Sequence, residues 1–180
     1  MDIEVLSWND IYRHSIKLAE KMLDENYIPD VVVGVMRGGW VPARIVIDLL
    51  DVKTLATLEI KFYKGIGETR EKPVITQPLV VNVRDKNVLV VDDVVDTGKS
   101  MSVAVDAIRL YGPKKIKTAS IALKPWSIFS PDYYSYVTSS WIVFPWEVRE
   151  TLQLILKKPE GMRELENVAR KITELSLIHI

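Results

Sequence analysis

The sequence predicts an α/β domain built on a mainly parallel β-sheet, and three observations lead to this fold class. The chain has 180 residues, 48% of them hydrophobic and 27% charged, which fits one compact domain with a core. Short apolar runs rich in β-branched residues, such as 31–33 and 88–91, have the composition of buried strands. Segments with helical spacing of apolar residues alternate with these runs, which is typical of a parallel sheet flanked by helices.

The first helix and the first strand are well marked. Ser7, with Asp10 three residues later, is a helix N-terminal signal, and apolar residues then recur at helical spacing to near Asn26. The run 30–35 is short, β-branched and followed by glycines, which predicts a buried strand. The chain is therefore expected to begin with a helix that leads into a strand.

A second strand–helix unit follows a tight turn at 36–39. Pro42 has the place of a proline at the first helical position, which predicts a helix from there to about Leu50. The run 54–62 is the next expected strand. The segment 63–78 is polar and shows no period, so we expect a long loop, which in a compact domain is usually functional or disordered.

The clearest unit lies in the middle of the chain. The run 88–91 predicts a central strand covered on both faces, 92–100 a polar turn, and 101–111 a helix. The run 116–123 predicts another strand. Ligands of open α/β sheets bind beyond the carboxyl ends of the strands, so the turn is the expected place for a site.

The C-terminal part of the chain has a different pattern of expected elements. We expect a loop at 124–135, a last short strand at 141–144, and a helical tail at 148–180, where apolar residues recur at helical spacing from Met162. The sequence thus divides into a domain at 1–147 and a C-terminal helical extension.

The composition excludes several classes of function. Lys plus Arg number 24 and Asp plus Glu also number 24, so no positive surplus supports non-specific nucleic-acid binding. The absence of cysteine removes disulfides, thiolate nucleophiles and zinc–thiolate sites. The apolar runs are too short to cross a bilayer, and the acidic N-terminus does not have the pattern of a signal peptide. We expect a cytoplasmic protein whose partners include neither nucleic acid nor membrane.

The polar turn carries a candidate phosphate site. The string 98–100 copies the end of a nucleotide P-loop, but the glycine that this motif needs five residues earlier is Asp93. Thr97, Gly98 and Ser100 instead lie at the start of a helix, where free backbone N–H groups and the helix dipole favour an anion. The alternative is that Thr97 and Ser100 only cap the helix.

Two adjacent carboxylates, Asp92 and Asp93, come directly before this candidate site. Ionised carboxylates repel phosphate unless they hold hydroxyl groups or a metal. Sugar hydroxyls are donors that a carboxylate accepts, and Mg²⁺ prefers oxygen ligands. The combination suggests a ribose with a phosphate on one side and a metal-bound group on the other. The alternative is a pair of solvated turn carboxylates.

These residues match a known family. The stretch 88–100 resembles, at every position, the signature with which type I phosphoribosyltransferases bind phosphoribosyl diphosphate (PRPP). The run 33–39 resembles their pyrophosphate loop, in which relatives often have a cis peptide bond. Residues 124–125 and 141–147 resemble the base-binding region of the xanthine-guanine and hypoxanthine branch, and 62–65 is similar to short archaeal members. The resemblance covers about residues 5–147.

The resemblance implies a type I phosphoribosyltransferase fold: a mainly parallel twisted sheet flanked by helices, a small base-binding hood and a C-terminal helical tail. It implies purine salvage, in which the 5-phosphoribosyl group moves from PRPP to N9 of a 6-oxopurine (guanine, hypoxanthine or xanthine). The products are a nucleoside 5′-monophosphate and pyrophosphate, and the transition state resembles an oxocarbenium ion. The implied cofactor is Mg²⁺, and a homodimer or homotetramer is expected.

The resemblance also implies a role for each matching residue. The implied catalytic residues are Asp96, Asp92 and Asp93. Asp92 and Asp93 would hold the ribose hydroxyls and place the metal, and Asp96 would accept the proton of N7 as N9 of the base attacks. The residues implied for the 5′-phosphate are Asp96, Thr97, Gly98, Lys99 and Ser100, and those for pyrophosphate are Met36, Arg37 and Gly38.

For the base, the implied residues are Lys124, Trp141 and Ile142. Lys124 would donate to the 6-oxo group, Trp141 would stack on the ring, and the Ile142 carbonyl would accept from an N–H of the base. A cation suits an oxygen acceptor and suits an amino group poorly, so Lys124 favours a 6-oxopurine over adenine.

The loop 61–78 fits a hood that closes over the site and excludes water, with Lys64, Arg70 and Lys72 as candidates for contact with pyrophosphate. Two alternatives stay open. In the first alternative, adenine is the substrate and Lys124 is turned away from the base. In the second, the protein is a PRPP-binding regulator without catalysis, although such regulators usually carry a DNA-binding segment or a basic face.

Overall fold

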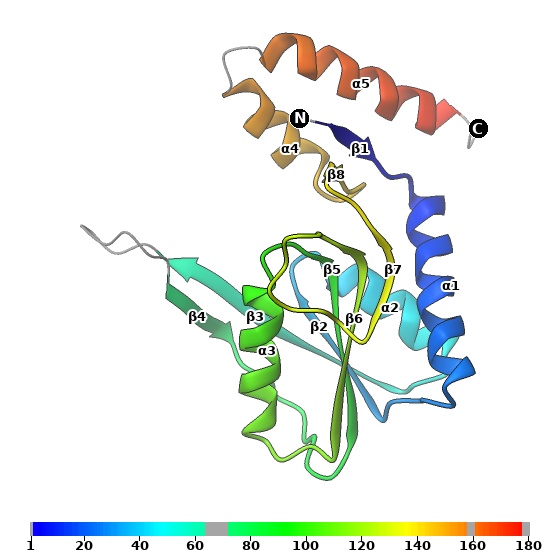
Figure 1. Cartoon of the computed structure of the whole chain (residues 1–180), viewed down its shortest axis with the longest axis vertical. Coiled ribbons are helices and arrows are strands. Elements are labelled where there is room, and N and C mark those ends of the chain that lie inside the picture. Colours follow the sequence, from blue (N-terminus) through cyan, green and yellow to red (C-terminus); the bar gives the residue numbers. More distant parts are fainter. Residues whose placement is uncertain (1, 64–71, 158–160, 178–180) are drawn as a thin grey trace. The chain divides into compact units, whose positions relative to one another are not determined.

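A computed structural model describes residues 2–63, 72–157 and 161–177 (Figure 1). The chain forms two compact units, Tyr12–Thr138 and the pair Met1–Ile11 with Ser139–Ile180. The elements, in chain order, are β1 (Ile3–Val5), α1 (Trp8–Asp24), β2 (Val31–Met36), α2 (Trp40–Leu49), β3 (Thr54–Tyr63), β4 (Lys72–Gln77), β5 (Asn87–Val95), α3 (Lys99–Arg109), β6 (Lys115–Leu123), β7 (Tyr133–Val137), β8 (Trp141–Val143), α4 (Val148–Leu156) and α5 (Gly161–Leu177).

The larger unit contains a six-stranded sheet with the strand order β4-β3-β2-β5-β6-β7. Neighbouring strands are parallel, except for β3 and β4, which are antiparallel. From β2 the chain continues to β3 on one side, whereas β5 leads to β6 and β7 on the other. The strand order therefore reverses between β2 and β5, and the carboxyl ends of these two strands are where ligands of such sheets bind.

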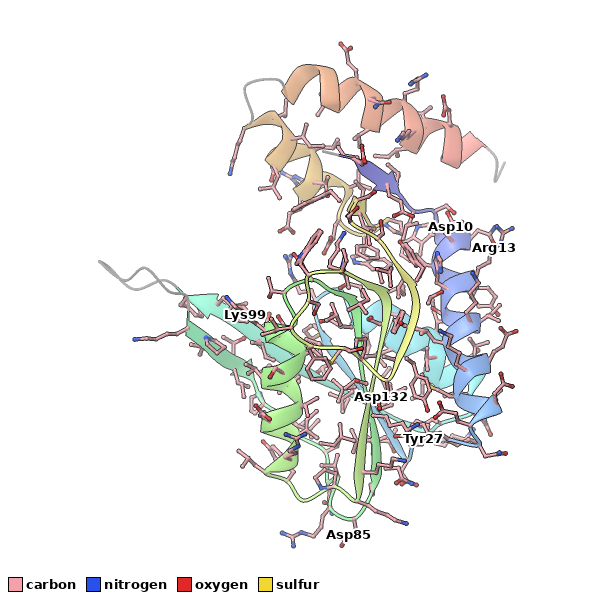
Figure 2. The ribbon with its side chains drawn as sticks, viewed as in Figure 1. Asp10, Arg13, Tyr27, Asp85, Lys99 and Asp132 are labelled. Carbon is pink, nitrogen blue, oxygen red and sulfur yellow. The ribbon has the colours of Figure 1, made fainter. Side chains whose placement is uncertain are left out.

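Helices cover both faces of this sheet (Figure 1). On β5, Val88 and Val90 join a core with α3, while Leu89 and Val91 join a second core with α1 and α2. The strand is thus buried on both sides, as its apolar run predicts. Tyr27, which follows α1, donates a hydrogen bond from its hydroxyl to the Val88 carbonyl at 3.1 Å (Figure 2).

The first helix, α1, begins where the capping signal predicts. The Ser7 hydroxyl accepts from the Asp10 N–H at 3.1 Å, and the Asp10 carboxylate accepts from the Ser7 N–H at 2.9 Å. Two backbone donors at the helix start are satisfied in this way. The helix ends at Asp24, two residues before the expected end.

The central strand β5 is longer than predicted. We expected a polar turn from residue 92, but β5 continues to Val95 and α3 begins at Lys99. Asp92 pairs with Ser120 and Val95 pairs with Leu123, so the pairing with β6 reaches the last residue of β5. This pairing outweighs the low strand propensity of two aspartates.

Helix α2 also begins earlier than predicted. It starts at Trp40, so Pro42 is its third residue and not its first. The first N–H groups of a helix have no acceptor within it, and a residue without an N–H is therefore tolerated there.

The segment 63–78 is not entirely a loop, contrary to our prediction. Residues Lys72–Gln77 form β4, which pairs with β3 at the edge of the sheet. Every residue of β4 is exposed, so the strand has no buried face that could produce an alternating pattern. Lys72 is its first residue, while Lys64 and Arg70 lie outside the residues that the structure describes.

The segment 124–135 also ends in a strand, because β7 begins at Tyr133 and forms the other edge of the sheet. The expected strand at 141–144 is confirmed as β8. It pairs with β1, a short strand that was not expected from the sequence.

The smaller unit consists of β1, β8, α4 and α5. The two strands are parallel, with Ile3 opposite Trp141, and the buried side chains include Phe144, Ile155 and Val168. The expected helical tail is thus present as two helices. Within the described ranges, no helix has the length and apolarity that crossing a bilayer requires.

Replacing Asp10 tests the capping of α1. Asp10→Ala removes the acceptor for the Ser7 N–H, and we expect the free energy of unfolding to fall by about 1 kcal/mol. Urea denaturation of the variant and of the exposed neighbour control Asn9→Ala measures the difference. Equal midpoints for the two variants would show that this pair does not stabilise the helix.

Candidate active site

The candidate site lies at the carboxyl ends of β2 and β5, where the strand order of the large sheet reverses. Two segments leave the sheet there. We call residues 36–39 the pyrophosphate turn and residues 96–100 the phosphate loop. The structure brings these two predicted segments to neighbouring strands, because Gly34 of β2 pairs with Val91 of β5. The peptide bond between Met36 and Arg37 is cis, as the family resemblance implies for this turn.

Glycines let the pyrophosphate turn lie directly against β5. A Cβ on Gly39 would lie 2.5 Å from the Val91 carbonyl oxygen and 2.6 Å from that of Val35. A Cβ on Gly38 would overlap the carboxylate of Asp93. The predicted pyrophosphate residue Gly38 and the predicted metal residue Asp93 are therefore in direct contact.

The two carboxylates of β5 are largely buried and oriented by the backbone. Asp92 is 9% exposed and Asp93 is 7% exposed. One oxygen of Asp92 accepts from the Asp93 N–H at 3.0 Å, and one oxygen of Asp93 accepts from the Val94 N–H at 2.8 Å. Their burial contradicts the alternative of two solvated turn carboxylates.

These carboxylates fit a magnesium ion by the chemistry of their donors. Both supply only oxygen, which hard cations prefer, and both lie beside the pyrophosphate turn. Among the described residues, no group of three or more His, Cys, Asp or Glu side chains could hold a metal. Mg²⁺ commonly binds through one or two carboxylates, with water and substrate phosphates as its other ligands, so two aspartates suffice.

The phosphate loop ends in a helix start with unused backbone donors. Gly98 is the N-cap of α3, its φ is 85°, and no side chain caps the helix through it. The Ser102 N–H is the first to bond back, to the Gly98 carbonyl at 3.0 Å, so the N–H groups before it have no acceptor within the helix. The Lys99 N–H has only a long contact of 3.4 Å with the Thr97 hydroxyl. This favours anion binding over the capping alternative; Figure 2 shows Lys99 at the helix start.

The connection between β6 and β7 packs on the phosphate loop, a contact that no sequence pattern predicts. The Ile128 N–H donates to the Thr97 carbonyl at 3.2 Å. A Cβ on Gly98 would lie 2.7 Å from both the Cβ and the backbone nitrogen of Phe129. The loop is therefore supported from this side by backbone.

Lys124, the predicted base-binding cation, begins this same connection. It is 7% exposed, so it is not the solvated surface lysine that its position at a strand end would suggest without the family resemblance. Its N–H donates to the carbonyl of Val95 at 3.0 Å, which fixes the backbone of Lys124 to the residue directly before Asp96. Two residues after Lys124, the indole N–H of Trp126 donates to the Asp96 carboxylate at 2.7 Å.

The other two predicted base residues belong to the smaller unit. Trp141 is 43% exposed, whereas Ile142 is buried within the β1–β8 pair. The Trp141 N–H donates to the Asp2 carbonyl at 2.8 Å. The three predicted base residues are thus divided between two units, with Lys124 in the larger one.

Glu59 of β3 is a charged neighbour of the pyrophosphate turn that no sequence motif marks. It pairs with Met36 in the sheet. A hydrogen bond from Thr76 at 2.5 Å is the main reason why the pKa of Glu59 lies below its ordinary value, and the charges of Lys61 and Arg37 add to this effect. Glu59 could have been placed beside Met36 if the register between the two predicted strands were known. The sequence alone does not determine that register.

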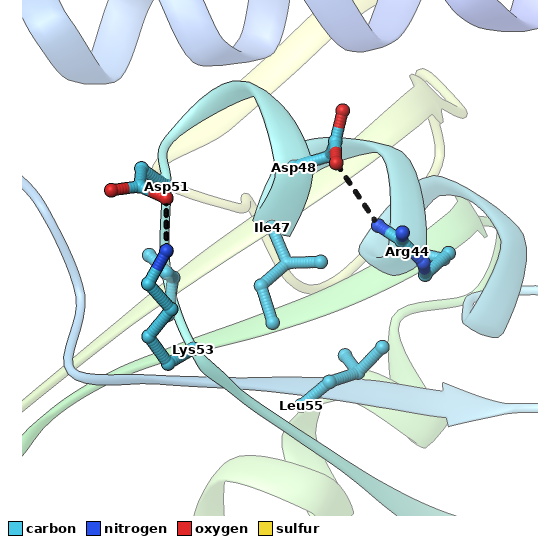
Figure 3. A pocket seen from close by; sticks show the side chains of 7 residues that line it. Arg44, Ile47, Asp48, Asp51, Lys53 and Leu55 are labelled. Carbon is cyan, nitrogen blue, oxygen red and sulfur yellow. Dashed lines mark hydrogen bonds and ion pairs between the residues drawn. The ribbon is translucent and has the colours of Figure 1, made fainter.

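A pocket of about 310 Å³ occurs elsewhere on the larger unit (Figure 3). It lies where α2 ends and β3 begins, and its rim carries the ion pairs Arg44–Asp48 and Asp51–Lys53. This is the edge with the amino ends of the strands, opposite to the edge where such sheets bind ligands. We therefore place the candidate site at the carboxyl edge and not in this pocket.

Alanine at the two glycines of the pyrophosphate turn should have different effects. In Gly39→Ala the new methyl meets backbone oxygens, and we expect the free energy of unfolding to fall by about 1–3 kcal/mol. In Gly38→Ala it meets the Asp93 side chain, which can turn away, so we expect a smaller loss of stability and a larger loss of PRPP affinity. Urea denaturation and calorimetric titration with PRPP and Mg²⁺ distinguish the two. The same stability and the same affinity in both variants would contradict this geometry.

Comparison with known proteins identifies the family of this chain. The phosphoribosyl transferase domain family matches residues 4–151. The xanthine-guanine phosphoribosyltransferase of Cereibacter sphaeroides is 34% identical over an alignment of 153 positions, and the match covers 79% of this chain and 86% of that protein. The corresponding protein of a Ruegeria species is 32% identical over an alignment of 157 positions, and the match covers 79% of this chain and 84% of that protein. The crystal structure of a purine phosphoribosyltransferase from Pyrococcus horikoshii is 46% identical, with a TM-score of 0.72, and covers 81% of this chain and 94% of that one. The chain therefore belongs to the phosphoribosyltransferase family and has the type I fold.

Proposed function

We propose that this protein is a 6-oxopurine phosphoribosyltransferase of purine salvage, which transfers the 5-phosphoribosyl group from PRPP to N9 of guanine, hypoxanthine or xanthine. Family membership supports the PRPP-dependent transfer. The choice of base rests on Lys124. This lysine is 7% exposed at the end of β6, and its N–H donates to Val95, the last residue of β5 before Asp96. The names of the similar proteins, xanthine-guanine and purine phosphoribosyltransferases, agree with this choice.

The reaction needs the two ends of PRPP to be held while the bond between ribose and pyrophosphate breaks. The phosphate loop offers the backbone N–H groups of the α3 start to the 5′-phosphate. The pyrophosphate turn offers Arg37 and its own backbone to the leaving group. Catalysis is then mostly positioning and electrostatics, because negative charge builds on pyrophosphate as the ribose becomes an oxocarbenium ion.

The acidic residues of the site bind the ribose and the metal and accept the proton of the base in this proposal. Asp92 and Asp93 hold the ribose hydroxyls, since an ionised carboxylate accepts hydrogen bonds from them. Asp96 accepts the proton from N7 of the base when N9 attacks. The same two aspartates of β5 would hold Mg²⁺, which neutralises charge on the pyrophosphate when bound.

Two alternatives lead to different results in one assay. An adenine phosphoribosyltransferase would use the same PRPP residues with a different base pocket. A PRPP-binding regulator would use them without turnover. The burial of Lys124 favours the 6-oxopurine enzyme over the first, since a cation suits the O6 acceptor and suits an amino group poorly.

The substrate is tested by offering guanine, hypoxanthine, xanthine and adenine separately with PRPP and Mg²⁺ in a spectrophotometric assay. We expect turnover with 6-oxopurines and not with adenine. Lys124→Met, which keeps the volume and removes the charge, should lower kcat/KM for those bases by about 10- to 100-fold, as for loss of a hydrogen bond to a charged group.

The exposed Lys114, directly before the first residue of β6, gives a matched control, and Lys114→Met should retain activity. Turnover with adenine alone would contradict the role of Lys124. Binding of PRPP without turnover of any base would support the regulator.

Removal of the metal should abolish turnover. We expect EDTA to stop the reaction and excess Mg²⁺ to restore it, because pyrophosphate leaves poorly with its charge unneutralised. Asp93→Asn should raise the Mg²⁺ concentration for half-maximal rate, while Asp106→Asn on the exposed face of α3 should not. Full activity in EDTA would exclude the proposed metal role.

The oligomeric state and the location belong to the same proposal. We propose a homodimer or homotetramer in the cytoplasm, and light scattering during gel filtration measures the oligomer directly.

A further inference from the structure

Trp126 contacts two residues of the candidate site at once. Its indole N–H donates to one oxygen of the Asp96 carboxylate at 2.7 Å. The Lys124 ammonium lies 5.7 Å from the centre of one of its rings, within the range of a cation–π interaction. One side chain thus touches both the residue proposed to accept the proton and the residue proposed to recognise the base.

The backbone holds Trp126 in this position. The Lys124 N–H donates to the Val95 carbonyl at 3.0 Å, and the Ser127 N–H donates to the Lys124 carbonyl at 3.0 Å. Trp126 therefore lies in a tight turn fixed to the last residue of β5, and Asp96 is the next residue along the chain. The contact joins two segments whose positions the sheet already determines.

Burial does not explain this tryptophan. Its side chain is 53% exposed, so much of a large apolar ring faces solvent. A residue retained for packing alone would gain little there, since the hydrophobic effect is proportional to the apolar area removed from water. The hydrogen bond from the indole N–H to Asp96 therefore says more about the role of Trp126 than its packing does.

The chemistry of the indole determines what this contact does. An indole N–H donates and does not accept, so this hydrogen bond fixes the rotation of the Asp96 carboxylate. A charge-assisted hydrogen bond of this length is among the stronger ones in proteins. With one oxygen held, the carboxylate presents its other oxygen in a defined direction.

We propose that Trp126 is a positioning residue, which orients the Asp96 carboxylate through its N–H and the Lys124 ammonium through its ring. The proposal rests on the proposed function, because it assigns Trp126 an effect through Asp96 and Lys124. It predicts that the N–H and the ring have separable consequences: the N–H affects the rate of transfer, and the ring affects the binding of the base.

The hydrogen bond itself is tested without any turnover. In ¹H–¹⁵N spectra the indole resonance of Trp126 is identified by its loss in Trp126→Phe. We expect that resonance to move in Asp96→Ala, which removes the acceptor, while the other indole resonances stay in place. An unmoved resonance would overturn the proposal, whatever the enzyme does.

Kinetics separate the two consequences. Trp126→Phe keeps a ring and loses the N–H, so we expect kcat to fall by about tenfold, as for one hydrogen bond to a charged group, with little change in KM for the base. Trp126→Leu removes both and should also raise KM for the base. PRPP affinity, measured by calorimetry, and the melting temperature should stay close to those of the wild type in both variants.

A double mutant decides whether Trp126 acts through Asp96. In the Asp96→Ala background, Trp126→Phe should lower kcat by less than about twofold, because the interaction is already absent. The control is Tyr111→Phe, which removes a polar atom from another exposed aromatic residue just beyond the far end of α3. A tenfold loss in both backgrounds, or an equal loss in the control, would overturn the proposal.

The two proposals fail in distinguishable ways. A wild-type protein that turns over no base contradicts the proposed function, even if the indole resonance responds to Asp96→Ala. Normal turnover with full activity in Trp126→Phe contradicts the positioning role alone.

Discussion

The pairing of β2 with β5 is the constraint on which the candidate site depends, because it sets two loops of different chemistry at neighbouring strand ends. Gly34 lies opposite Val91, and beyond this pair the pyrophosphate turn folds back so closely that Gly39 touches the backbone of β5. The phosphate loop leaves from the end of the same strand. The proposed substrate, with a phosphate at one end and a diphosphate at the other, needs two such loops at neighbouring positions.

The proposed function requires the site to bind anions although it is rich in acidic residues, and the hydrogen bonds of these residues reduce the conflict. Asp92 and Asp93 each accept from a backbone N–H, and Asp96 accepts from the Trp126 indole. Glu59 accepts from Thr76 beside the charges of Lys61 and Arg37. Each carboxylate thus has part of its charge stabilised by the protein, which reduces its repulsion of a phosphate. The zero net charge of the chain conceals this local arrangement.

Patterns that depend on neighbouring residues could be predicted from the sequence, and those that depend on distant partners could not. The capping pair Ser7 and Asp10 and the buried run of β5 act over a few residues, so both are visible in the sequence. The extension of β5 to Val95 and the fully exposed β4 exist because another strand lies beside them. The packing of Phe129 against Gly98 and the contact of Trp126 with Asp96 likewise join residues about 30 positions apart, and no local pattern marks them. The family resemblance predicts the phosphate loop but not the residues that support it.

The position of Gly98 has a consequence for the evolution of this loop. Its φ of 85° disfavours any residue with a side chain, and the space where a Cβ would lie is already taken by Phe129. A smaller residue at 129 would not remove the conflict, because the backbone nitrogen there is as close as the side chain. No single tolerated substitution therefore leads away from glycine at this position. The exposed face of α3, one turn further along the chain, has no such restriction, so lineages descended from this protein should diverge on the helix while its first turn keeps the same backbone path.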